Sequence, residues 1–172
     1  IDTTGEQGYI RAVRDQFGEL YRQAGLLVSP SIAYMYTFAE IAAELALETH
    51  GIDALETATL CRGPRGGTSG VTVGSTASIF ELFRQEACYL WEKKLVAHAT
   101  DASIDAVDPG FVQPVFALPW GGTSLPVYLE NDARVRSCSS FVGFYDNNVM
   151  QTVHALGQKW EAEYKNLPRD HQ

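Results

Sequence analysis

A glycine-rich segment, residues 61–76, offers the best chemistry for holding a ligand. Glycines let a backbone approach a ligand closely, and arginines supply charge and paired donors for a phosphate or carboxylate. No lysine precedes Lys93, so the segment is not a phosphate-binding P-loop, and we expect no cofactor. We predict instead a site for a small anionic ligand, formed by Arg62, Arg65, Gly66, Gly67, Thr68 and Ser69.

The same segment permits two other interpretations. It can be a surface or assembly loop that presents backbone edges to a partner. Alternatively, Cys61 can be the nucleophile of a small hydrolase or transferase, because histidines and aspartates elsewhere could complete a catalytic triple. The candidates are His98 or His154 as the base and Asp101 or Asp146 as the group that orients it. No Gly-x-Ser-x-Gly motif accompanies them.

Neither the carboxylates nor the histidines follow a metal-binding pattern. Glu40, Glu44 and Glu48 share one face of a predicted helix, but no Glu-x-x-His motif accompanies them, so we predict a solvated face. The four histidines lack zinc spacing, and the three cysteines form no Cys-x-x-Cys pair. We therefore predict no metal site. The cysteine count fits either one disulfide plus a free thiol or three buried thiols.

Length and composition limit the function classes. The 172 residues, 45% of them hydrophobic, are enough for a packed core, and we predict a single globular domain over residues 1–172. The net charge of −8 argues against a nucleic-acid partner. The longest uncharged stretch, residues 23–39, is too short to span a membrane. Because Ile1 is compatible with processing, the compartment stays open, including an extracytoplasmic or virion-type context.

Helical spacing of apolar residues appears in four segments. It predicts helices over residues 4–24, 29–50, about 75–98 and about 146–167. The second helix has an apolar face and further apolar residues on its other sides, which predicts a central helix or one shared with a partner. That apolar face consists of Tyr34, Phe38, Ile41 and Leu45.

Apart from a short strand that Val71–Val73 could form, strand-like patterns lie in the second half of the chain. Residues 111–118, 125–130 and 134–145 are apolar, β-branched or alternating, and prolines within them favour edge strands. We expect two to four short strands. The predicted fold class is α+β, mainly helical, with three to four helices packed against a small antiparallel β element near residues 111–145.

The absence of a catalytic signature favours an interaction or assembly subunit without catalysis, one that can self-associate. The alternative is a small hydrolase or an anion-binding domain that uses the glycine-rich loop 61–75. For a protein partner or a second copy, the predicted contact residues are aromatic, since aromatic side chains dominate interfaces. They are Trp120, which lies beside two glycines, and Tyr34 and Tyr36 of the second helix.

Overall fold

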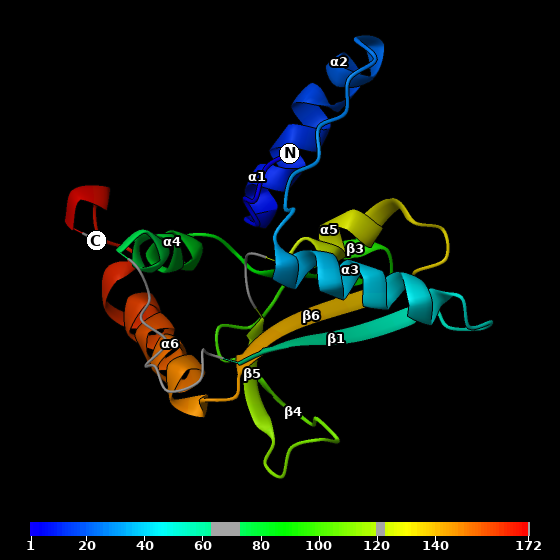
Figure 1. The fold of residues 1–172 in the computed structure, drawn as a ribbon. Coiled ribbons are helices and arrows are strands. Elements are labelled where there is room, and N and C mark those ends of the chain that lie inside the picture. The colour runs from blue at the N-terminus through cyan, green and yellow to red at the C-terminus, as the bar shows by residue number, and fades with distance from the viewer. Residues whose placement is uncertain (63–72, 120–122, 172) are drawn as a thin grey trace.

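The computed structural model describes residues 1–62, 73–119 and 123–171, and it has a six-stranded sheet at its centre (Figure 1). The sheet is antiparallel except for one parallel pair, β1 with β6. The strands are β1 (Ala54–Cys61), β2 (Cys88–Trp91), β3 (Lys94–Ala97), β4 (Ile104–Ala106), β5 (Val115–Pro119) and β6 (Ser137–Phe144).

Strand β6 organises the sheet. It pairs with β1 over eight residues, from Ala54 opposite Ser137 to Cys61 opposite Phe144. On its other edge it pairs first with β2 and then with β5, which extend the sheet to β3 and β4. Six of its eight residues are buried, as expected for a strand covered on both faces. Strand β1 has no second strand neighbour among the described residues and therefore forms an edge.

Helices surround this sheet. Helix α3 and the short helix α5 cover the face near β1 and β6, and α6 lies against β5 and β6. None of the helices in the described residues is long and apolar enough to cross a membrane. The α-helices are α1 (Gln7–Ala12), α2 (Gly18–Gln23), α3 (Tyr34–Leu47), α4 (Val73–Phe83), α5 (Leu125–Tyr128) and α6 (Asn147–Lys159). Single-turn segments, of π type at 13–17 and 160–164 and of 3-10 type at 129–131 and 169–171, extend them.

The segment from α1 to α2 projects from the body as a helical arm (Figure 1). The buried amide of Gln7 fixes its base: its nitrogen donates to the carbonyls of Cys88 and Thr123 at 2.9 and 3.0 Å, and its oxygen accepts from the Cys88 amide at 2.7 Å. Farther along, Arg14 pairs with Glu130 at 2.7 Å. Beyond Arg14 the arm exposes large apolar side chains, among them Phe17 and Leu20.

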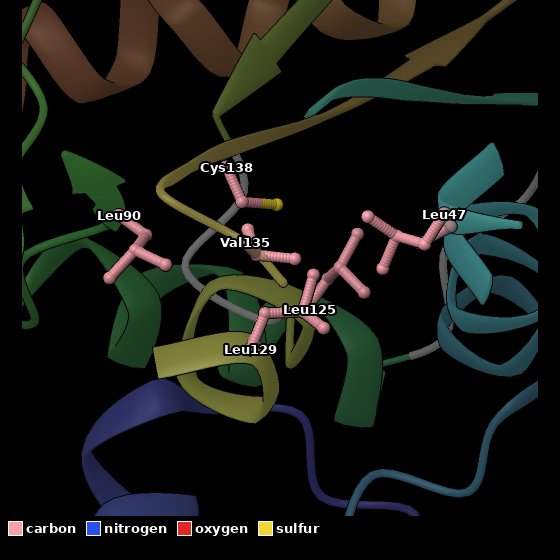
Figure 2. Close-up of a cluster of buried hydrophobic side chains, with 7 residues drawn as sticks. Leu47, Leu90, Leu125, Leu129, Val135 and Cys138 are labelled. Atoms are coloured by element: carbon pink, nitrogen blue, oxygen red, sulfur yellow. The ribbon is translucent and has the colours of Figure 1, made fainter. Parts of the chain in front are cut away.

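The main hydrophobic cluster lies between α3, α5 and the start of β6 (Figure 2). Leu47 of α3 and Leu125 of α5 point toward one another, and Cys138 of β6 borders them. A second cluster, of Ala106, Ala117 and Phe141, is covered by Leu60 and Ile104. Leu55 joins the first cluster and Leu60 the second, so β1 contributes side chains to both.

The predicted fold class is wrong. The molecule is α+β, but the sheet is a major element and not a small one near residues 111–145, because four of its six strands lie before residue 111. Strand β1 alternates between more and less exposed positions. The apolar residues near Leu90 suggested helix to residue 98, but short apolar runs do not separate helix from strand. They form the β2–β3 hairpin, whose turn residues Glu92 and Lys93 have φ of 47° and 66°.

Two local predictions also differ from the structure. Residues 125–130 are helical rather than extended, because Pro126 occupies the first helical turn, where its missing N–H costs nothing. The second helix begins at Tyr34 and not at the Ser29–Pro30 pair. That pair instead lies beside the N-terminal segment, because the Asp2 amide donates a hydrogen bond to the Ser29 carbonyl at 3.0 Å. The arm and the C-terminal helix agree with their predicted positions.

Gly143 provides a stability test of the sheet. A Cβ at this position would lie 2.9 Å from Val115 Cγ1 and 3.1 Å from the Phe116 carbonyl oxygen. We expect Gly143→Ala to lower the free energy of unfolding by about 1–3 kcal/mol, because the backbone of β5 has to move. Urea denaturation measures this change. Gly18→Ala is the matched control, since nothing lies within 4 Å there and helical alanine should stabilise by roughly 0.5–1 kcal/mol. Equal effects at both positions would contradict the β5–β6 packing.

Candidate interaction surface

Helix α3 packs with its small residues and exposes its large ones. Ala43 is 2% exposed, and Ala39 and Leu47 are also buried. Phe38 is 65% exposed and Leu45 is 60% exposed, on the opposite side of the same helix. Residues spaced by three and four share one helical face. The face of Tyr34, Phe38, Ile41 and Leu45, predicted to be the apolar side of a mostly buried helix, is therefore open to solvent.

Polar contacts fix this orientation. The Ser124 hydroxyl donates to the carboxylate of Glu40 at 2.7 Å, and Arg134 donates to both oxygens of Glu44 at 2.9 and 3.1 Å. The predicted solvated stripe of glutamates thus faces the segment around α5, and only Glu48 behaves as a freely exposed member. Rotation of α3 to bury its large apolar residues would break these contacts and move the alanines off the sheet.

A groove runs between α3 and β1. Its volume is about 610 Å³. The helix contributes apolar side chains to one wall, and β1 forms the other wall over almost its whole length. Among the described residues, β1 has a strand partner on one side only, and the other edge of such a strand can pair with an added strand. The helical wall consists of Tyr34, Phe38, Ala39, Ala42, Ala43 and Ala46.

The C-terminal end of β1 closes the groove with aromatic and charged groups. The Tyr34 hydroxyl lies 3.8 Å from Cys61 Sγ, and burial raises the pKa of this tyrosine. The Arg62 guanidinium lies 4.5 Å from the ring centre of Tyr145. The Tyr145 hydroxyl donates to the Asp108 carboxylate, and this hydrogen bond raises the pKa of Tyr145 and lowers that of Asp108. Arg62 is thus already stacked on an aromatic ring.

Residues 37–172 match the model of a family described only as a family of unknown function (DUF5938). The chain belongs to this family. No curated protein and no solved structure is significantly similar to it. The match covers most of α3, all six strands and the C-terminal helix, so most of the residues that line the groove between α3 and β1 lie within the matched region.

The predicted site residues of this DUF5938 chain divide into two sets. Arg62, Tyr34 and Tyr36 lie in the described residues. Tyr34 and Arg62 border the groove, whereas Tyr36 packs against Gly5, where a Cβ would lie 2.5 Å from its ring. The structure therefore brings together two residues that were predicted for different roles. Arg65, Gly66, Gly67, Thr68, Ser69 and Trp120 lie outside the described residues.

The hypothetical catalytic triple is not assembled in the described part of the chain. No histidine lies within hydrogen-bonding distance of Cys61 there. His98 stacks on Tyr89 at 4.6 Å, and His154 lies against Phe116 at 5.8 Å. Asp146 accepts a hydrogen bond from the Asn148 amide at the start of α6 and so acts as a helix cap.

The cysteines and the possible metal ligands are also separated. All three cysteines are free, and burial raises the pKa of Cys138 to about 12, which makes that thiol unreactive. Within the described ranges, no group of three His, Cys, Asp or Glu side chains could hold a metal ion.

Sequence reasoning missed the role of β1 and the orientation of α3. Both left a signal. The alanines at 39 and 43 with Leu47 mark a narrow stripe suited to close packing on a sheet, and residues 54–61 contain alternating threonines and small residues typical of a strand. The prediction placed the large apolar face of α3 in the core, and not the alanine stripe, because the free energy of transfer from water scales with the apolar area that is buried.

Glu40 makes a prediction about pH dependence. Burial raises the pKa of this carboxyl above its usual 4.5, and the Ser124 hydrogen bond offsets this only in part. The folded protein therefore binds this proton more tightly than the unfolded chain does. The associated stability is fully present below about pH 4.5 and is lost as the pH rises through the folded pKa. We expect Glu40→Gln, which keeps an acceptor for Ser124, to stabilise the protein at pH 7.

The measurement is the urea midpoint of wild type and Glu40→Gln between pH 4.5 and pH 8. The gain should be below about 1 kcal/mol at pH 7 and should shrink toward the acidic end. Glu44→Gln is the matched control because it removes the Arg134 ion pair at a partly exposed position and should not stabilise. A destabilised Glu40→Gln at neutral pH would contradict the burial of an ionised carboxylate.

Proposed function

We propose that this DUF5938 chain is an interaction or assembly domain, and that the α3–β1 groove with the exposed face of α3 is its binding surface. The observation that carries the proposal is the orientation of α3. Four large apolar residues of one helix face solvent while alanines of the same helix are buried. Monomeric proteins rarely leave contiguous apolar patches uncovered, and such patches mark sites of association.

The exposed strand edge supports the same proposal. An extended chain can add to a sheet edge through main-chain hydrogen bonds, while pockets beside the edge accept its side chains. The groove offers both elements, since β1 supplies the edge and the Phe38 side of α3 supplies apolar walls. Aromatic side chains at such a surface are typical anchors of a protein interface.

The alternative function, a small hydrolase or an anion-binding domain, depends on residues 63–72, which lie outside the described residues. The flanking Cys61 and Arg62 do not favour it: Cys61 is buried beside Tyr34, and Arg62 stacks on Tyr145. The alternative stays a prediction from the sequence alone.

Two leucines of α3 test the orientation on which the proposal depends. Leu47 is 9% exposed and Leu45 is 60% exposed. We expect Leu47→Ala to lower the free energy of unfolding by about 2–4 kcal/mol through loss of core packing. Leu45→Ala should change it by less than about 0.5 kcal/mol when the protein is dilute and unassociated. Chemical denaturation of both variants measures this difference. A larger loss for Leu45→Ala would show that the apolar face is core.

Site-specific photo-crosslinking tests the binding surface itself. A benzophenone amino acid at position 38 or 45 should cross-link to a protein chain in the cells that produce the protein. The same amino acid at Leu156, which is exposed on α6, is the control and should give no such product. Mass spectrometry of the product identifies the linked chain. Equal cross-linking from all three positions, or none from positions 38 and 45, would overturn the proposal.

A further inference from the structure

Among the described residues, the outer edge of β1 has little of the usual protection of an edge strand. Natural proteins guard long edges with lysine, proline, a bulge or a covering element. Strand β1 has eight residues in uninterrupted register with β6, and it contains neither lysine nor proline. No strand of the described residues lies on its other side. An edge this regular is suited to pair with another strand.

We propose that the strand added to this edge is β1 of a second copy of the chain, antiparallel to the first about a two-fold axis. This inference rests on the proposed function, because it names the occupant of the same groove. Two-fold dimers are the commonest closed assemblies, and their interfaces are self-complementary. A two-fold axis normal to the sheet pairs residues that lie on the same face of the sheet. One residue of β1 then lies at the axis opposite its own copy, and this residue defines the register.

Charge selects the register. Glu56 and Arg62 are exposed, and neither forms an ion pair with another described residue. They lie on the same face of β1, since their positions differ by an even number. Pairing centred on Thr59 places Glu56 of each copy opposite Arg62 of the other, which gives two charge pairs at one interface. The other pairs are Ala58 with Leu60 and Thr57 with Cys61.

The surroundings of Arg62 favour this role. Its guanidinium stacks on the ring of Tyr145 at 4.5 Å. Stacking occupies the flat face of a guanidinium and leaves its N–H edges for hydrogen bonds. Arg62 already interacts with the Tyr145 hydroxyl, and its charge helps to lower the pKa of Asp108. The side chain is therefore held at the end of β1, and the remaining donors among its five N–H groups can bind a further carboxylate, which Glu56 of a second copy offers.

The same symmetry covers the apolar groove. An axis normal to the sheet keeps both copies of α3 on one face of the joined sheet. The N-terminal end of α3 lies beside the C-terminal end of β1, because Tyr34 contacts Cys61, whereas Leu47 at its other end packs into the core. The N-terminal ends of the two helices thus come nearest the axis. Tyr34 and Phe38, both largely exposed, contact the second copy there.

Charge reversal with mixing tests this arrangement. The native mass of the wild-type protein, measured by analytical ultracentrifugation from about 1 to about 100 µM, should show a dimer. Glu56→Arg and Arg62→Glu each put like charges opposite one another twice, and each should weaken the dimer at least about tenfold. An equimolar mixture of the two variants restores both opposite-charge pairs and should form a heterodimer with an affinity close to that of the wild type.

The control is Asp101→Arg, a charge reversal at an exposed position in the β3–β4 connection, which should leave the dimer unchanged. Circular dichroism verifies that each variant is folded. A wild-type monomer at every concentration, or a mixture that stays monomeric, would overturn the second copy as occupant. Cross-linking from position 38 to a different protein would also overturn it while supporting the interaction surface. If neither position 38 nor position 45 gave a cross-link, the proposed function itself would be wrong.

Discussion

The contact between the alanine stripe of α3 and the sheet determines most of what is distinctive in this molecule. Ala39 and Ala43 have almost no side chain, so the helix lies close to the strands and Leu47 reaches the main cluster. Close packing of this kind is disturbed even by one added methylene group. Because one face of α3 is committed to the sheet, its aromatic and branched residues have only solvent or another chain to face. The groove between α3 and β1 exists because the small residues of α3, and not its large ones, face the sheet.

The second structural constraint is the central position of strand β6 in the sheet. In the part of the chain that the structure describes, it is the one strand that pairs with β1, β2 and β5, and side chains on both of its faces are covered. Gly143 lets β5 approach it closely, while Cys138 joins the cluster under α5. A substitution that disrupts β6 would therefore disturb the whole sheet. By contrast, β1 depends on β6 for its position but supports no further strand among the described residues.

The sequence predicts the strongly periodic elements and fails where tertiary contacts decide. The arm and the C-terminal helix follow from helical spacing, and the Asp146 cap agrees with the predicted start of α6. The hairpin at Glu92 and Lys93 was not predicted from the sequence, because its turn consists of residues that rarely adopt positive φ. The alanine stripe of α3 was a local sign of its buried face, but the contacts that hold this orientation were not predictable, because Glu40 and Glu44 bond to Ser124 and Arg134, which are about 90 positions away. No local pattern contains such a partner.

The attachment of the arm has a consequence for how the molecule opens. The Gln7 amide both donates to and accepts from the Cys88 backbone, so a side chain takes the place of a neighbouring strand at the start of β2. Directional bonds at two residues, Gln7 and Arg14, with few buried apolar residues beyond them, make a small cooperative unit. The arm is therefore expected to detach and reattach as a whole while the sheet stays intact. Amide hydrogens in residues 7–23 would then exchange with solvent long before those of β6.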